Sequence, residues 1–195
     1  RGLGNFAAIT KSRLSGNTYV PHPRRAIFIE TSGRCNLACR FCAYAKSKPG
    51  GFMPSERFAD VLEQIGDMGY RFVWLTPMLG EVFADPQITE KFALLEKDPR
   101  IEAFSFYSNF ILARLAQVEA LSGLRKLSGL YISLYGTDAE TFEQTTRKPA
   151  SQFEKLQENL SHLLGIMDDW RPRDGINFNV RTVKTQLPIL ECDTP

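Results

Sequence analysis

The stretch AIFIETSGRCNLACRFC, residues 26–42, joins an apolar run to a loop that holds three of the chain's four cysteines. Apolar, β-branched and aromatic residues predict a strand over residues 26–32. Cys35, Cys39 and Cys42 follow in the spacing C-x3-C-x2-C. In a reducing compartment, thiols clustered this closely hold metal or do redox chemistry more often than they form disulfides. The stretch therefore predicts a strand that leads directly into a sulfur-rich site.

Beyond this stretch, the chain alternates short apolar runs with segments whose apolar residues recur every three or four positions, a pattern typical of strands followed by helices. The expected strands are 26–32, 72–75, 103–108, 129–136 and 176–183. The expected helices are 54–70, 88–98, 112–121, 138–146 and 151–170, with Ser55 and Asp138 as N-caps of the first and the fourth. Such alternation requires parallel strands joined by right-handed crossovers. A doubly wound sheet and a barrel, complete or partial, both satisfy that requirement.

Distinctive segments follow the strands at one end. The cysteine loop follows the first strand, TPMLGE (76–81) the second, SNF (108–110) the third, and YG (135–136) closes the fourth. In both kinds of fold the chemistry collects at the carboxyl ends of the parallel strands. We therefore expect the functional site at that end.

Three clustered thiolates admit two kinds of metal centre. A structural zinc ion usually takes four protein ligands, and the other Cys and His residues of the chain are Cys192, His22 and His162. A zinc site would describe a binding module without catalysis. Three thiolates alone suit a cubane iron–sulfur cluster that leaves one iron open to a substrate or cofactor.

With the aromatic Phe41 before its last cysteine, the C-x3-C-x2-C loop resembles the cluster loop of the radical S-adenosylmethionine enzymes, and the resemblance extends over roughly residues 26–185. It implies an α/β fold, a partial (β/α)6 TIM-like barrel of parallel strands, here truncated after the fifth strand. It also implies a 4Fe–4S cluster on Cys35, Cys39 and Cys42, with S-adenosylmethionine bound to the open iron. Reductive cleavage of that cofactor would give a 5′-deoxyadenosyl radical that abstracts a hydrogen atom. The electron would come from a donor such as flavodoxin or ferredoxin.

The same resemblance implies residues that bind the amino end of the cofactor. MLGEVFADP (78–86) resembles the Gly-Gly-Glu segment of the family, so Gly80 and Glu81 are expected to receive the amino group of S-adenosylmethionine. Leu79 stands where the family has its first glycine. YSNFIL (107–112) resembles the Thr-Asn-Gly turn after the third strand, which makes Asn109 a cofactor-binding residue, with Phe110 in place of the glycine.

Residues 131–160 resemble the strand-four region of the SPASM and twitch subgroup, whose members carry further clusters in a C-terminal extension. This likeness implies that Ser133 lies near the cofactor and that Arg147 pairs with its carboxylate. On the fifth strand, Arg181 is expected to reach the ribose. Because the subgroup includes peptide-maturing enzymes, the expected substrate is a peptide side chain or a small metabolite.

Composition argues against nucleic-acid binding, membrane insertion, secretion and histidine-based hydrolysis. The net charge of +2 gives no indication of nucleic-acid binding, and no apolar run approaches the ~20 residues that span a membrane. Residues 1–25 lack the apolar core of a signal peptide, so we expect a cytoplasmic protein with an N-terminal extension (1–25) before the core (26–195). The chain has only two histidines, and neither gives a plausible Ser-His-Asp order, so we do not expect a hydrolase of that type.

Overall fold

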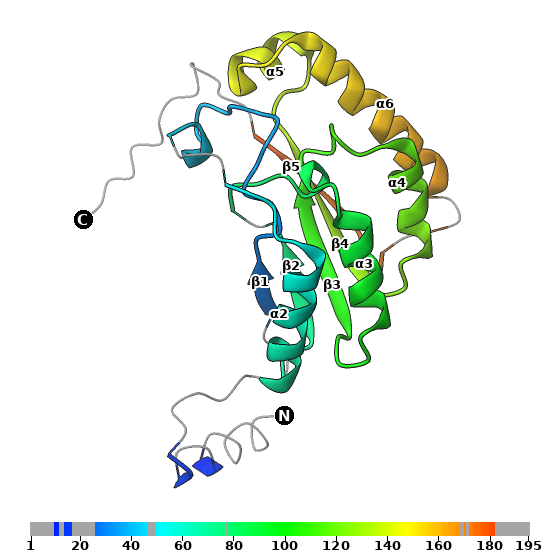
Figure 1. Ribbon diagram of the computed structural model, residues 1–195. Coiled ribbons are helices and arrows are strands. Elements are labelled where there is room, and N and C mark those ends of the chain that lie inside the picture. The colour runs from blue at the N-terminus through cyan, green and yellow to red at the C-terminus, as the bar shows by residue number, and fades with distance from the viewer. Residues whose placement is uncertain are drawn as a thin grey trace, which may run out of the picture.

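The computed structural model describes residues 10–11, 14–16, 26–46, 50–76, 78–167, 170 and 172–181. Within these residues, five parallel strands form one sheet in the order β1-β2-β3-β4-β5 (Figure 1). The strands are β1 (Ala26–Ile29), β2 (Phe72–Leu75), β3 (Ala103–Ser108), β4 (Leu127–Leu134) and β5 (Ile176–Val180). The helices are α2 (Ser55–Asp67), α3 (Ile88–Lys97), α4 (Leu115–Ala120), α5 (Ala139–Thr146) and α6 (Ala150–Ile166). Three 3-10 turns accompany them: η1 (Ala43–Lys46), η2 (Val82–Ala84) and η3 (Leu121–Gly123).

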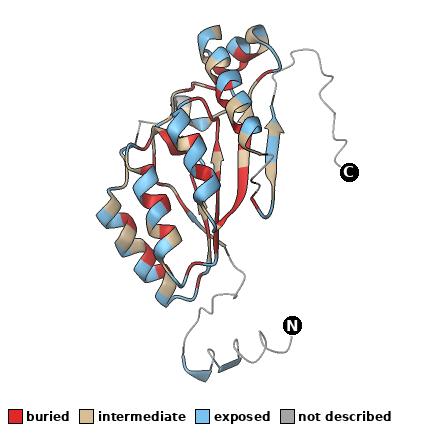
Figure 2. Ribbon diagram, turned by 90° about the vertical axis from the view of Figure 1, so that its right-hand side faces the viewer, coloured by how far each residue is buried: buried red, intermediate tan, exposed pale blue. Residues whose placement is uncertain are grey.

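The strand order distinguishes between the two expected architectures. It follows the chain without reversal, and the helices cover one side of the curved sheet (Figures 1 and 2). A doubly wound sheet would reverse its order and carry helices on both faces. The predicted partial TIM-like barrel is therefore confirmed, as an open sheet with β1 and β5 at its edges in the described part of the chain.

The core lies between the sheet and its helices. The parallel register aligns a buried row across the first four strands, which consists of Ile29, Leu75, Phe106 and Leu130. Phe92 of α3 stacks on Phe106 at a centroid distance of 5.2 Å. Burying each such side chain contributes roughly 1.5–3 kcal/mol, so this layer holds the strand ends at fixed positions.

The opposite face of the sheet carries aromatic side chains toward the inside of the partial barrel. Trp74 contacts Phe28, Tyr107 and Tyr131 at centroid distances of 6.0, 5.4 and 4.8 Å. These residues alternate with the buried, helix-facing positions, as the pleat of a strand requires. Phe28 lies on edge strand β1 and is 61% exposed. The aromatic rings thus line the inner wall below the carboxyl ends of the strands.

Two of the predicted elements begin more than one residue from the expected position. Strand β4 begins at Leu127 rather than at 129, so Gly129 lies within it, where an added Cβ would lie only 2.8 Å from the Tyr131 ring. Helix α4 begins at Leu115 rather than 112, because the amide of Asn159 holds the preceding residues in a loop by donating to three backbone carbonyls.

The two predicted N-caps have different outcomes. Asp138 caps α5 as predicted, accepting a hydrogen bond from Thr141 N at 2.8 Å. The prediction for Ser55 was wrong, since Pro54 occupies the N-cap of α2 without a side-chain bond. The Ser55 hydroxyl instead donates to Glu90 Oε2 at 2.6 Å and ties α2 to α3. None of the helices in the described residues is both long and apolar enough to cross a membrane.

Candidate functional site

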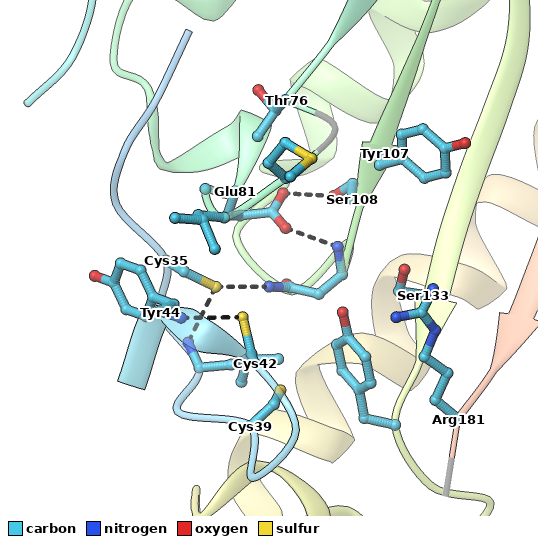
Figure 3. A pocket seen from close by; sticks show the side chains of 16 residues that line it. Cys35, Cys39, Cys42, Tyr44, Thr76, Glu81, Tyr107, Ser108, Ser133 and Arg181 are labelled. Carbon is cyan, nitrogen blue, oxygen red and sulfur yellow. Dashed lines mark hydrogen bonds between the residues drawn. The ribbon is translucent and has the colours of Figure 1, made fainter. Parts of the chain in front are cut away.

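The three cysteines line one cavity of about 230 Å³ (Figure 3). The loop between β1 and α2 carries them, and β2, β3, β4 and β5 each contribute residues from their carboxyl ends to the other walls. Cys39 is buried, whereas Cys35 and Cys42 are partly buried. The site therefore lies where the fold predicts.

The cysteine loop is tied to the end of α5. Ala38 N donates to Thr146 O at 3.1 Å and Arg40 N donates to Thr145 O at 3.0 Å. On the other side, Gly33 packs so closely on the residues before α2 that an added Cβ would lie 2.8 Å from Gly50 Cα. Side chains on this loop consequently sit in a fixed frame rather than on a free turn.

The thiols suit a positively charged partner. Burial raises the pKa of Cys35 to about 11 and that of Cys39 to about 12, and the neighbouring negative groups add to both shifts. Thiolates in this cavity therefore need a cation close by. N–H groups already aim at the sulfurs: Leu37 N lies 3.5 Å from Cys35 Sγ, and Tyr44 N lies 3.4 Å from Cys42 Sγ. Such N–H contacts are among the features that tune thiolate-bound iron–sulfur clusters. The donor set thus fits the expected cluster.

The described residues give no support to a single-ion zinc site. Among them, no three His, Cys, Asp or Glu side chains gather closely enough to hold one metal ion. His162 belongs to α6, with Nε2 3.3 Å from Oε1 of Glu119 on α4, and is not among the residues that line the cavity. His22 and Cys192 lie outside the described residues.

Glu81 belongs to the loop that follows β2, and it lines the cavity although only 2% of its surface is exposed to solvent. Its Oε1 accepts a hydrogen bond from Ser108 Oγ at 2.5 Å, and its Oε2 accepts one from Asn109 N at 2.7 Å (Figure 3). Oε1 also accepts a hydrogen bond from Phe83 N at 3.2 Å. Burial raises the pKa of Glu81 to about 7, and these hydrogen bonds oppose the shift. A carboxylate offers about four acceptor positions, so Oε2 retains capacity for one more donor.

Gly80 fills a position that admits no side chain. A Cβ there would lie 1.6 Å from the carbonyl oxygen of Ser32. The next residue continues the contact, because Glu81 N donates to Arg34 O at 2.7 Å. The loop after β2 and the cysteine loop are thus pressed together, and only glycine permits this approach.

Asn109 and Ser133 also line the cavity, as the sequence predicts for cofactor-binding residues. The Asn109 amide donates to Asn36 Oδ1 at 2.9 Å and approaches Cys35 Sγ at 3.7 Å. Phe110, in place of the family's glycine, adopts a left-handed conformation with φ 62°. Three hydrogen bonds from Asn159 to the surrounding carbonyls hold this strained turn.

The two predicted arginines differ in position. Arg181 lines the cavity just beyond β5 (Figure 3). Its guanidinium lies 5.9 Å from the Phe41 ring centroid. Arg147 is the exposed C-cap of α5, in a left-handed conformation with φ 58°, and is not among the lining residues. The structure therefore brings together all of the predicted site residues except Arg147.

Sequence reasoning missed several residues of the cavity wall, including Thr76, Tyr107 and Tyr135. Each follows or ends a strand, so their position at the carboxyl end was the available signal. Thr76 has φ 48° and bonds through its hydroxyl to Thr31 Oγ1 at 3.1 Å.

Comparison with known proteins agrees with the geometry. The family model described as the Radical SAM superfamily matches residues 29–167. No curated protein matches the chain.

Solved structures share the fold at low sequence identity. SuiB from Streptococcus suis bound to S-adenosylmethionine is 19% identical over 83% of this chain, with a TM-score of 0.61. anSMEcpe with bound AdoMet is 20% identical over 80% of this chain, with a TM-score of 0.60. BtrN in complex with AdoMet and 2-DOIA is 15% identical over 81% of this chain, with a TM-score of 0.56. This chain spans 36% of SuiB, 42% of anSMEcpe and 57% of BtrN.

Proposed function

The chain belongs to the radical SAM superfamily, and on that premise we propose that it reductively cleaves S-adenosylmethionine and abstracts a hydrogen atom from its substrate. One observation carries the proposal. Three cysteine thiols and the buried carboxylate of Glu81 line a single cavity at the carboxyl end of a parallel sheet. When bound there, a 4Fe–4S cluster would supply the electron that splits the cofactor into methionine and a 5′-deoxyadenosyl radical.

The residues of the chain would bind and orient the two groups. Cys35, Cys39 and Cys42 would each hold one iron, and the amide of Asn109 would donate toward the Cys35 sulfur. The remaining acceptor position of Glu81 would take the cofactor ammonium, an interaction between two charged groups that shortens and strengthens a hydrogen bond.

We propose that Arg181 neutralises the carboxylate of S-adenosylmethionine. Its guanidinium belongs to the cavity wall, and a guanidinium matches a carboxylate with two parallel donors. The family resemblance instead implies that Arg147 pairs with this carboxylate and that Arg181 reaches the ribose. Arg147 and Arg181 are therefore alternative partners of the carboxylate. Ser133, on the same wall, would contact the ribose or the carboxylate.

The substrate is proposed to be a peptide side chain or a small metabolite. Among the structural neighbours, SuiB has been seen bound to the precursor peptide SuiA, and BtrN to 2-DOIA. We further propose a cytoplasmic enzyme that takes its electron from flavodoxin or ferredoxin and has no nucleic-acid or membrane partner. In this proposal, residues 1–25 form an extension and residues 26–195 the catalytic core.

The test is to reconstitute the cluster anaerobically, reduce it with dithionite and measure 5′-deoxyadenosine from S-adenosylmethionine. We expect nucleoside from the native chain and none from Cys39→Ala, because one iron loses its thiolate. Cys192→Ala is the matched control and should retain cleavage. A native protein with four irons and four sulfides per chain that yields no nucleoside would refute the proposed function.

A further inference from the structure

Glu30 is an acidic residue that the proposed mechanism leaves unused. It directly follows β1 and is half-buried. Its carboxylate accepts a hydrogen bond from Met78 N on Oε2 and one from Gly80 N on Oε1, both at 3.2 Å. The N–H of Leu79, between them, faces the same carboxylate and favours its charged form. One carboxylate thus faces three successive backbone N–H groups and is hydrogen-bonded to two of them, an arrangement that binds anions well.

These bonds fix the direction of the peptide planes in the loop after β2. A trans peptide carries its N–H and C=O on opposite sides, and the described peptide bonds include no cis bond. Since the N–H groups of Leu79 and Gly80 point at Glu30, the carbonyl oxygens of Met78 and Leu79 point away from it. Met78, Leu79 and Gly80 line the cavity, whereas Glu30 does not. The loop therefore lies between Glu30 and the cavity, with these two carbonyls on the cavity side.

Side-chain packing does little to hold this conformation. Met78 is 77% exposed, so its side chain contributes little packing. The other hydrogen bonds act at the two ends of the loop: Thr76 N donates to Ile29 O at 2.9 Å, the Thr76 hydroxyl bonds to Thr31 Oγ1, and Glu81 N donates to Arg34 O at 2.7 Å. Between these ends, the carboxylate of Glu30 is the group that accepts hydrogen bonds from Met78 N and Gly80 N.

We propose that Glu30 is a positioning residue, which turns the carbonyls of Met78 and Leu79 into the cavity to receive, beside Glu81, the ammonium group of S-adenosylmethionine. The inference rests on the proposed function. A carbonyl held in place before the ligand arrives costs no reorganisation on binding. Glu30 acts through the loop and touches neither cofactor nor substrate.

The test compares Glu30→Gln with Thr31→Val on reconstituted protein. A glutamine side chain keeps the shape but places an NH2 group against one of the loop N–H groups. Titration calorimetry would measure the Kd of S-adenosylmethionine and of 5′-methylthioadenosine, which lacks the amino-acid portion. Iron and sulfide content and the thermal midpoint would be measured in parallel.

We expect Glu30→Gln to keep its cluster and to bind S-adenosylmethionine at least about tenfold more weakly, a change of about 1.4 kcal/mol. Its affinity for 5′-methylthioadenosine should stay unchanged. Thr31→Val, which removes a different hydrogen bond between the same segments, should lower the thermal midpoint and keep both affinities.

Three results would overturn the inference. The first is an unchanged Kd for S-adenosylmethionine in Glu30→Gln. The second is an equal loss for both ligands, which would indicate a general disturbance of the cavity. The third is loss of the cluster, which would make Glu30 a support of the cysteine loop. Failure of the proposed function would be distinct, because the native protein itself would then neither bind nor cleave S-adenosylmethionine.

Discussion

Replacing Lys91 with methionine tests the ion pair that is buried beside the site. Lys91 Nζ lies 2.6 Å from Asp85 Oδ2, and both side chains are 0% exposed. Asp85 ends η2, four residues after Glu81, and its Oδ1 accepts a hydrogen bond from Gln87 N at 2.9 Å. Methionine retains the length of lysine and removes its charge, so Lys91→Met leaves the Asp85 carboxylate buried without a counterion.

Removing one partner of a buried pair costs about 3–5 kcal/mol. A domain of this size loses about 2–4 °C of midpoint per kcal/mol, so the thermal midpoint of Lys91→Met should fall by about 6–20 °C. The double variant Asp85→Asn/Lys91→Met removes both charges and keeps an oxygen for Gln87 N. We expect it to recover at least about 2 kcal/mol of the loss, because no unpaired charge remains buried.

Urea unfolding of the native chain, both single variants and the double variant closes the thermodynamic cycle. Circular dichroism at fixed cluster content would follow the transition. A loss below about 1 kcal/mol in Lys91→Met would refute the reasoning, since it would mean that water reaches the carboxylate. A double variant that loses the sum of the two single effects would refute it too, because the charges would then act independently.

Three further predictions concern the cavity and its support. Arg181→Gln should weaken S-adenosylmethionine binding at least about tenfold by calorimetry, whereas Arg147→Gln should change the Kd by no more than about twofold. The reverse result would indicate that Arg147 binds the cofactor carboxylate. Gly80→Ala should retain the cluster by iron analysis and lose S-adenosylmethionine binding, since its Cβ would lie 1.6 Å from Ser32 O; unchanged binding would contradict the close packing. Asn159→Leu should lose about 2–3 kcal/mol in urea unfolding, because it leaves buried carbonyls without a donor; a loss under about 0.5 kcal/mol would mean that other groups satisfy them.

The sequence predicts the sheet and the location of the candidate site because both can be inferred from local patterns, namely apolar runs and residue spacing, without knowledge of tertiary contacts. Strand Phe72–Leu75 has the predicted bounds, since its apolar run is short and flanked by polar residues. The cysteine spacing and the Gly80–Glu81 pair identify the cavity because parallel strands bring their carboxyl ends to one edge.

The remaining features depend on where a side chain points after the chain has folded. Arg147 follows a segment that matches the family, yet its left-handed backbone at the end of α5 leaves it exposed. Gly129 has the appearance of a strand boundary, although its role is to admit the Tyr131 ring within the strand. Glu30 gave no signal of its own, because its partners lie about fifty residues away in the sequence and are backbone groups.

Glu81 links the candidate site to the hydrogen bonds that hold the fold together. Its carboxylate bonds to Ser108 and Asn109, so it joins the end of β2 to the end of β3 whether or not a ligand is present. Its own N–H donates to Arg34 O, directly before the first cysteine. One residue thus fixes the separation between the cysteine thiols and the carboxylate that is proposed to receive the cofactor ammonium. Because that separation is set by hydrogen bonds within the protein, the oxygens that would receive the cofactor are held in place before it binds, which lowers the ordering cost of binding.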